Sequence, residues 1–185
     1  MQQIRYSMCA LAATTLFAQQ FTLRDTEGRV HDRMEWGYYA AVVVYFAMTD
    51  CPVSNSYVPE MNRIHDAYAG RGVLFLAVAV DLKLTRTAAA RYANEYGYRF
   101  PVLLDPHRTL ARLSNATISS QVAVLSAAGR VLYLGRIDDR VEDFGVHRVQ
   151  PTSTDLRDAL DAVLAGRPVA HAVTKSIGCA IPPAH

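Results

Sequence analysis

The sequence lacks the features by which nucleic-acid-binding and metal-binding proteins are usually identified. Its net charge is only +2 at pH 7 and its basic residues are scattered, so they form no electrostatic footprint for nucleic acid. Its six histidines are dispersed without the spacing of metal ligands, and zinc-finger spacing does not occur. Internal repeats and low-complexity segments are also absent. We therefore exclude a nucleic-acid partner and expect neither a metal ion nor a cofactor.

The sequence also lacks an apolar run of the roughly 20 residues that a membrane-spanning helix needs. Near the N-terminus, Arg5 precedes the mostly apolar stretch Met8–Ala18. This layout is typical of a secretory signal peptide that is cleaved after Ala18. We expect residues 1–18 to be a signal peptide, with no stable membrane anchor, and the protein to be periplasmic or secreted. The alternatives are a frayed first helix or a lead-in strand.

Cysteine is scarce, with only three residues in the chain. Cleavage of the signal peptide would remove Cys9 and leave Cys51 and Cys179 as the only thiols. An even pair of cysteines in an oxidising compartment favours a disulfide bridge.

What the sequence does contain is an alternation of apolar strands and helical segments. The chain has 51% hydrophobic and 19% charged residues, which fits one globular domain with a sizeable core. Two valine-rich runs, Ala40–Phe46 and Val73–Val80, predict strands that are buried on both faces. A helical pattern follows each run, which favours parallel pairing through crossover helices. The other predicted strands are 21–23, 29–31, 102–104, 121–125 and 131–135, and the predicted helices begin near residues 52, 85, 106 and 153.

The order of these elements describes an α/β fold with the thioredoxin architecture. We expect a three-layer sandwich with a mixed central sheet, an N-terminal hairpin extension and a C-terminal tail. Residues 19–168 are predicted to form the domain, and residues 169–185 the tail that carries Cys179.

Cys51 lies where a buried strand ends and a helix begins, in the segment Thr49-Asp50-Cys51-Pro52. The first amides of a helix have no partner within it and the dipole is positive there, so a thiol is stabilised as the nucleophilic thiolate. Such a corner is expected to be exposed, at the carboxyl end of a parallel sheet where ligands bind. The alternative is a small apolar residue that only fills the core. We predict thiol redox chemistry with Cys51 as the catalytic residue.

Several side chains are candidate supports of this thiolate. Asp50 raises the pKa of the neighbouring thiol unless a cation offsets it, and Arg136 or Arg140 is a candidate for that cation. Both arginines also fit ordinary surface positions. Thr49 and Ser54 are candidate hydrogen-bond donors to the thiolate, and Ser54 is equally suited to capping the helix amides.

Three motifs carry a resemblance to a known family: TDCPVSNSYVPEMNRI, GRIDDR, and the tail signature Thr174–Ile181 with Gly178-Cys179. Together with the element order, residues 20–166 resemble the redoxins, the branch of the thioredoxin superfamily that includes alkyl hydroperoxide reductase and thiol-specific antioxidant proteins. The motifs are similar to those of secreted or periplasmic redoxin-like proteins. The resemblance implies an oxidoreductase whose partner is an external thiol reductant or a disulfide-containing protein, with a peroxide as the alternative substrate.

The sequence departs from this family at three positions. Ser54 stands in place of the second cysteine of Cys-x-x-Cys, so no local disulfide can form. Met48 stands where typical peroxiredoxins have threonine, which favours disulfide exchange over peroxide reduction. Ser120 replaces a cis proline that faces the active cysteine. A cis bond before another residue costs about 3–4 kcal/mol, so we expect the bond before Ser120 to be trans and the loop to be altered.

The role of Cys179 is open between three alternatives. It is a catalytic resolving thiol if the tail folds back over Cys51, a permanent staple if the two form a stable disulfide, or a partner in an intermolecular bridge.

The leading function is thiol:disulfide oxidoreduction. The alternatives are a thiol-dependent peroxidase, a protein that docks a redox partner or binds copper through Cys51 and a histidine such as His147, and a purely structural domain.

Overall fold

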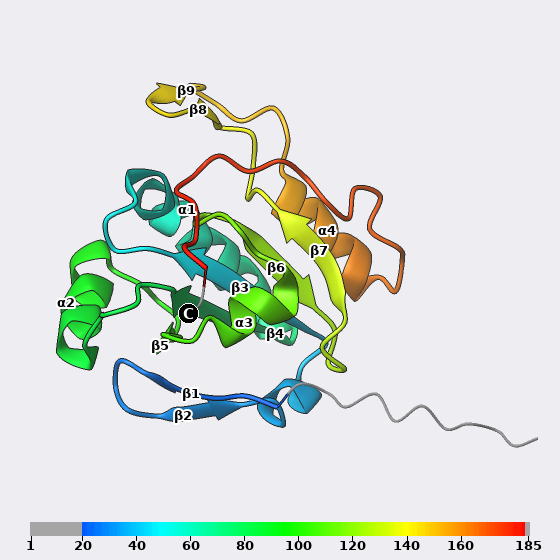
Figure 1. Cartoon of the computed structure of the whole chain (residues 1–185). Coiled ribbons are helices and arrows are strands. Elements are labelled where there is room, and N and C mark those ends of the chain that lie inside the picture. Colours follow the sequence, from blue (N-terminus) through cyan, green and yellow to red (C-terminus); the bar gives the residue numbers. More distant parts are fainter. Residues whose placement is uncertain (1–19, 184–185) are drawn as a thin grey trace, which may run out of the picture.

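A seven-stranded mixed sheet forms the centre of the molecule in the computed structural model, which describes residues 20–183 (Figure 1). The strand order is β2-β1-β5-β4-β3-β6-β7. β3 pairs in parallel with β4, and β4 with β5, whereas the other neighbours are antiparallel. The strands of this sheet are β1 (Thr22–Asp25), β2 (Val30–Asp32), β3 (Ala41–Ala47), β4 (Val73–Ala79), β5 (Val102–Leu104), β6 (Val122–Leu125) and β7 (Val131–Gly135).

Both faces of the sheet are covered, so that the molecule has three layers. In β3, Val43 and Tyr45 belong to the core beneath α1 and α4, whereas Val42 and Val44 belong to the core that includes residues of α3. This alternation follows from the pleat of a strand, in which successive side chains point to opposite faces. The helices are α1 (Pro52–Tyr68), α2 (Arg86–Tyr96), α3 (Thr109–Ser114) and α4 (Asp155–Leu164), with short 3-10 helices η1 (Glu35–Tyr38) and η2 (Ala69–Arg71).

The predicted order of strands and helices is confirmed, and the predicted mixed α/β sheet with it. The sequence did not predict η1 or the two-stranded hairpin formed by β8 (Val141–Asp143) and β9 (Val146–His147). The hairpin projects from the body of the molecule, at the top of Figure 1. Its residues from position 142 onward are exposed, and strands this short carry too little periodicity to be recognised.

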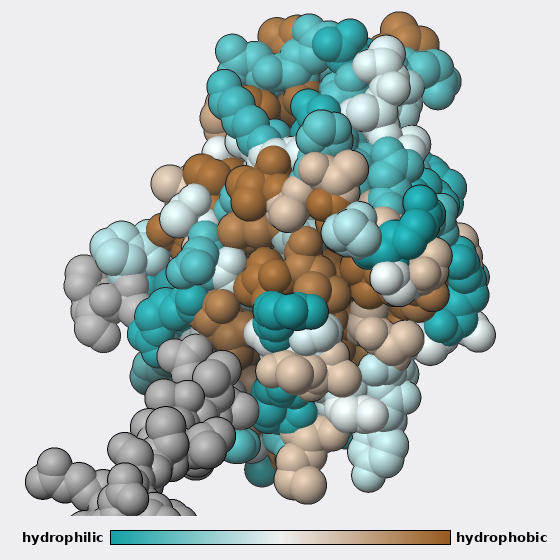
Figure 2. All heavy atoms as spheres, turned by 90° about the vertical axis from the view of Figure 1, so that its right-hand side faces the viewer, coloured by the Kyte–Doolittle hydropathy of each residue, from teal (hydrophilic) through white to brown (hydrophobic). Residues whose placement is uncertain are grey.

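Figure 2 views the side of β7 and α4, where hydrophobic side chains gather across the middle of the face. The predicted signal peptide, residues 1–18, lies outside the residues that the structure describes. Among residues 20–183, no helix is both long enough and apolar enough to cross a membrane.

The C-terminal tail returns across the molecule after α4. It first runs beside β7, where Leu134 and Val173 form a parallel bridge. It then crosses the loop before β6, where Ile118 and Ala180 form an antiparallel bridge. The tail thereby reaches the end of the sheet at which β3 gives way to α1.

Candidate active site

Cys51 is the residue immediately before α1, and its backbone is still extended, with φ −90° and ψ 108°. Its carbonyl accepts the hydrogen bond that opens the helix, from the amide of Asn55 at 3.0 Å. Pro52 takes the first helical position, where its missing N–H costs no hydrogen bond. The amide of Ser54 lies close to the Cys51 sulfur and favours its thiolate. The sequence therefore places the sulfur at the helix end where unpartnered amides stabilise a thiolate.

The pKa of Cys51 reflects a competition between burial and hydrogen bonding. Burial raises the pKa, because it disfavours the charged thiolate. Four nearby donors, the Cys179 thiol, the Ser119 hydroxyl and the amides of Ser54 and Cys179, favour the thiolate strongly enough to outweigh burial and lower the pKa from its ordinary value. The Ser119 contact is loose, since that hydroxyl forms no hydrogen bond of standard geometry within the described residues.

Cys179 lies against Cys51, and both residues are free thiols. Burial, the hydrogen bond with Cys51 and the negative charge of the Cys51 thiolate raise the pKa of Cys179 to about 11. Asp50 adds to this effect through its charge. The pair is therefore asymmetric: Cys51 is the sulfur that ionises first, and Cys179 is the protonated partner that donates to it.

The tail is seated on the loop before β6 by close backbone contacts. The amide of Ser119 donates to the carbonyl oxygen of Cys179 at 2.8 Å, and the hydroxyl of Ser120 donates to the carbonyl oxygen of Ile177 at 2.7 Å. A Cβ atom on Gly178 would lie only 2.0 Å from the carbonyl oxygen of Ser119. The glycine of the Gly178-Cys179 pair therefore permits an approach that no other residue allows without displacement of the backbone.

Ser120 stands at the position where the family usually has a cis proline, and its backbone adopts a different conformation. No cis peptide bond occurs among residues 20–183, so the expected trans bond before Ser120 is confirmed. Its φ is +80°, in the left-handed region that non-glycine residues rarely adopt. Its amide donates to the carbonyl oxygen of Phe46 at 2.7 Å, at the end of β3. Ser120 therefore links β3 with the tail.

The expectation that Cys51 is exposed is wrong. Its exposed fraction is 0%. A corner at the carboxyl end of a sheet is open only when nothing covers it, and here Ile177 and Cys179 pack against the core beside it. The sulfur is thus both activated and covered.

The two hydroxyls that were candidate donors to the thiolate are engaged elsewhere. Thr49 donates its hydroxyl hydrogen to Asp81 at 2.9 Å. The Ser54 hydroxyl donates to the carbonyl oxygens of Met48 at 3.2 Å and Cys51 at 3.1 Å, and it caps no helix amide. The contribution of Ser54 to the site is its backbone amide, and the expected side-chain roles are corrected accordingly.

The structure does not bring Arg136 to the thiol. Its guanidinium Nε donates to Asp155 at 2.9 Å and Nη2 to Ser153 at 3.1 Å, which joins the end of β7 to the start of α4. Arg140 instead lies over the ring of Tyr57, with its Cζ 4.8 Å from the ring centre. Neither arginine is among the groups with the largest effects on the pKa of Cys51.

His147, the histidine considered for a copper site, lies exposed in β9. Within residues 20–183, no three His, Cys, Asp or Glu side chains are grouped so as to hold a metal ion.

Ser119 and Ile177 are the site residues that the sequence analysis missed. Their roles depend on the tail pairing with the loop before β6, and no local pattern indicates that pairing. The one available signal is that Ser119 adjoins Ser120, the position already singled out for its missing proline.

Solved structures share the overall fold of this chain. A hypothetical protein, SMc02350, from Sinorhizobium meliloti 1021 is 27% identical, with a TM-score of 0.76 over 89% of this chain and 91% of its own. The exposed lipoprotein thioredoxin Etrx1 of Streptococcus pneumoniae strain TIGR4 is 20% identical, with a TM-score of 0.53 over 64% of this chain and 89% of its own. The fold is therefore thioredoxin-like.

Curated relatives match a shorter region. The thiol-disulfide oxidoreductase ResA of Geobacillus thermodenitrificans (strain NG80-2) is 33% identical over 89 residues, which cover 48% of this chain and 49% of ResA. The chain spans about half the length of the curated relatives it matches.

The comparison with protein-family models assigns the chain to a family. The model of the AhpC/TSA family matches residues 16–133, well over half of the chain, and this region includes Cys51 and the strands and helix around it. The match includes the motif TDCPVSNSYVPEMNRI and agrees with the thioredoxin-like sheet. The chain belongs to the AhpC/TSA family.

Proposed function

We propose that this protein is a thiol:disulfide oxidoreductase in which Cys51 is the nucleophile and Cys179 the resolving cysteine. The observation that carries the proposal is the contact between the two thiols at the N-terminus of α1, where the pKa of Cys51 is lowered and that of Cys179 is raised. An activated sulfur with a second thiol against it is the arrangement that disulfide exchange requires. The names of the ResA relatives support the same chemistry.

The reaction consists of two exchange steps. The Cys51 thiolate attacks one sulfur of a substrate disulfide, so that a mixed disulfide forms and the other substrate sulfur leaves as a thiolate. Cys179, once deprotonated, attacks the Cys51 sulfur, and the second substrate thiolate leaves as the Cys51–Cys179 disulfide forms. The substrate gains two electrons, the two cysteines lose two, and an external thiol reductant returns the pair to its starting state.

Substrate access requires the tail to move. Cys51 is fully covered, and Ile177 and Cys179 pack beside it. The tail is bound near the thiol by single hydrogen bonds, such as that from Ser119 to Cys179, rather than by a long strand pairing. Few bonds are lost when such a segment opens, so its local opening costs less than global unfolding.

Peroxide reduction is the second candidate, and the AhpC/TSA family match favours it. In that reaction the Cys51 thiolate attacks one peroxide oxygen, the O–O bond breaks, and the other oxygen takes up a proton and leaves as water or an alcohol. The sulfenic acid formed on Cys51 then condenses with the Cys179 thiol, so that a second water leaves and the Cys51–Cys179 disulfide forms. Against it, Met48 stands at the threonine position of typical peroxiredoxins, and the Thr49 hydroxyl donates to Asp81.

We also propose that the protein acts outside the cytoplasm, with an external thiol or a disulfide-containing protein as its partner. The charged and then apolar start of the sequence supports this location, and so does the pair of cysteines that cleavage after Ala18 would leave. N-terminal sequencing of exported protein tests it, and a mature chain that retains Met1 would contradict it.

Two matched variants test the reaction. Cys51→Ser is expected to abolish disulfide reduction, whereas Cys179→Ser is expected to stop after the first step and accumulate a mixed disulfide that mass spectrometry detects. Full activity of Cys51→Ser would refute the proposal.

Treatment of the reduced protein with one equivalent of peroxide distinguishes disulfide exchange from peroxide reduction. Rapid formation of a sulfenic acid or of the Cys51–Cys179 disulfide favours the peroxidase.

A further inference from the structure

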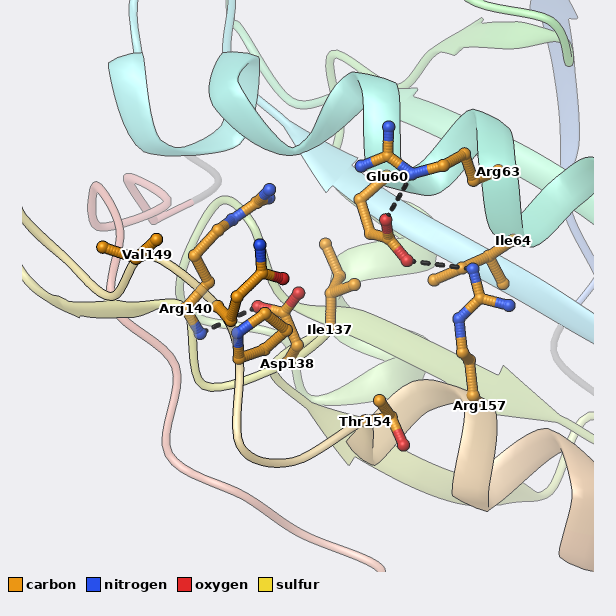
Figure 3. A pocket seen from close by; sticks show the side chains of 11 residues that line it. Glu60, Arg63, Ile64, Ile137, Asp138, Arg140, Val149, Thr154 and Arg157 are labelled. Atoms are coloured by element: carbon orange, nitrogen blue, oxygen red, sulfur yellow. Dashed lines mark hydrogen bonds and ion pairs between the residues drawn. The ribbon is translucent and has the colours of Figure 1, made fainter.

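The acidic side chains of α1 are compensated by neighbouring arginines. Glu60 lines a cavity between α1 and α4, where its carboxylate accepts from Nε of Arg63 at 2.7 Å and from Nη2 of Arg157 at 3.0 Å, as the dashed lines in Figure 3 indicate. Asp66 pairs with Arg99. The negative charges of these two carboxylates are therefore balanced within the protein.

Asp50, which directly precedes Cys51, has no such partner. It is exposed, and among residues 20–183 its carboxylate forms neither an ion pair nor a hydrogen bond. Its charge nevertheless reaches the thiol pair, since it contributes to the raised pKa of Cys179. An uncompensated negative charge therefore lies beside the reacting sulfur, within the range over which charges interact in water.

An open hollow of about 470 Å³ adjoins this carboxylate. Its lining comes from the loop before α1, the first turns of α1 and the last residue of α2, and Asp50 is the one charged residue in it. The lining residues are Thr49, Asp50, Pro52, Asn55, Ser56 and Tyr96. Two of them, Asp50 and Pro52, flank Cys51 in the chain, so the hollow borders the active corner.

The remaining polar groups of the hollow suit a cation. The Ser56 hydroxyl donates its hydrogen to the carbonyl oxygen of Val53 at 2.8 Å, so its oxygen is left to accept. Nδ2 of Asn55 donates to the hydroxyl of Tyr96 at 3.2 Å, which holds that side chain at the edge of the hollow. Tyr96 is 36% exposed. An aromatic ring attracts a cation in the same way as a carboxylate does, though more weakly.

This arrangement favours one class of substrate. Asp50 belongs to the body of the domain, so it stays beside Cys51 when the tail opens. A cationic group next to the substrate disulfide is then attracted to the carboxylate, and an anionic group is repelled. We propose that Asp50 and Tyr96 select disulfides with a positive charge next to the sulfur, such as a lysine or arginine that neighbours a substrate cysteine. This inference rests on the proposed disulfide exchange at Cys51.

Three small disulfides of similar size test the selection. Cystamine carries ammonium groups, dithiodipropionate carries carboxylates, and hydroxyethyl disulfide is uncharged. Timed alkylation and mass spectrometry give the rate at which each one oxidises the reduced full chain. The same thiolate attacks every probe, so its ionised fraction cancels in the ratio of the cystamine rate to the dithiodipropionate rate. The intrinsic difference between the probes is common to all variants.

Asp50→Asn is expected to lower this ratio by about tenfold at low ionic strength, whereas Asp50→Glu keeps the charge and most of the ratio. Tyr96→Leu should lower it by about threefold. Added salt should reduce the ratio of the wild type, because it screens exposed charges. Glu27→Gln is the matched control, since it removes an exposed carboxylate from the turn between β1 and β2, away from the hollow.

Circular dichroism first establishes that each variant is folded. An unchanged ratio in Asp50→Asn, or an equal fall in Glu27→Gln, would overturn the inference. The uncharged disulfide reports on the thiol chemistry separately. If it does not oxidise the wild type, the proposed function fails and this inference with it. If it does, and the ratio is independent of Asp50, only this inference fails.

Discussion

The amide of Ser119 donates to the carbonyl oxygen of Cys179 at 2.8 Å, one of the bonds that hold the tail cysteine beside Cys51. The loop before β6 therefore binds the tail and also borders the site around Cys51. The same tail that supplies the second thiol also covers the first, so activation of Cys51 and its protection from solvent have a common structural origin.

Gly178→Ala is expected to loosen the tail. The new Cβ would lie 2.0 Å from the carbonyl oxygen of Ser119, so the backbone must shift, at a cost of about 1–3 kcal/mol in unfolding free energy. Native Cys51 should then react faster with iodoacetamide at neutral pH. Gly70→Ala is the control, because a Cβ atom on Gly70 would have no neighbour within 4 Å. Equal alkylation rates in the two variants would contradict the role given to Gly178.

The two thiols are expected to titrate in opposite directions from an ordinary cysteine. Loss of the hydrogen bond to Cys51 in Cys179→Ala should raise the pKa of Cys51, since that bond favours the thiolate. Loss of the Cys51 charge in Cys51→Ala should lower the pKa of Cys179 from about 11. Ultraviolet thiolate absorbance measures both values. A Cys51 pKa that is unchanged by Cys179→Ala would show that the contact has no electrostatic effect.

Arg136→Lys is expected to affect stability rather than reactivity. Lysine cannot reproduce the paired bonds of the guanidinium to Asp155 and Ser153, and for a pair this exposed a loss of about 1 kcal/mol in unfolding free energy is expected. Urea denaturation measures the loss, with Arg91→Lys on the exposed face of α2 as the control. The charge-removing variant Arg136→Gln tests the electrostatic role, and a rise in the pKa of Cys51 in it would restore Arg136 as the cation that offsets Asp50.

Asp139 is expected to make stability depend on pH in the acid range. The Thr152 hydroxyl and the amides of Thr152 and Ser153 donate to its carboxylate and hold its pKa below the ordinary value. The resulting stabilisation is present above the pKa of an unfolded aspartate, about 4, and is lost as the pH falls through the lower folded value.

The stability difference between the wild type and Asp139→Asn should therefore be largest near neutral pH and should shrink below about pH 4. Thermal unfolding across this range measures it. Glu95→Gln, at an exposed position of α2, is the control and should show no such narrowing. A stability difference between the wild type and Asp139→Asn that stays constant on acidification would contradict the role given to Asp139.

The sheet and its helices were predictable because their signals are local. Ala41–Ala47 and Val73–Ala79 are continuous apolar strands buried on both faces, as their composition indicates. The face of α1 that carries Tyr57, Met61 and Ile64 is buried at the predicted helical spacing. The hairpin of β8 and β9 was not predicted, because its exposed residues show neither the alternation typical of a half-buried strand nor the spacing typical of a helix.

The roles of individual polar groups were less predictable than the elements that carry them. Thr49 and Ser54 lie next to Cys51 in the sequence, yet their hydroxyls donate to Asp81 and to backbone carbonyls. Arg136 was a candidate cation for the thiol, yet it pairs with Asp155. A hydroxyl or a guanidinium takes whichever acceptor the fold brings near, and the local sequence does not specify that acceptor.

Local sequence alone was enough to place Cys51 between a buried strand and a helix, because apolar runs, a proline and helical spacing act over a few residues. The meeting of Cys51 with Cys179, and the burial that follows from it, was decided by the folded chain. The tail has no periodicity of its own, and its backbone groups find partners only on β7 and on the loop before β6 once those elements are assembled.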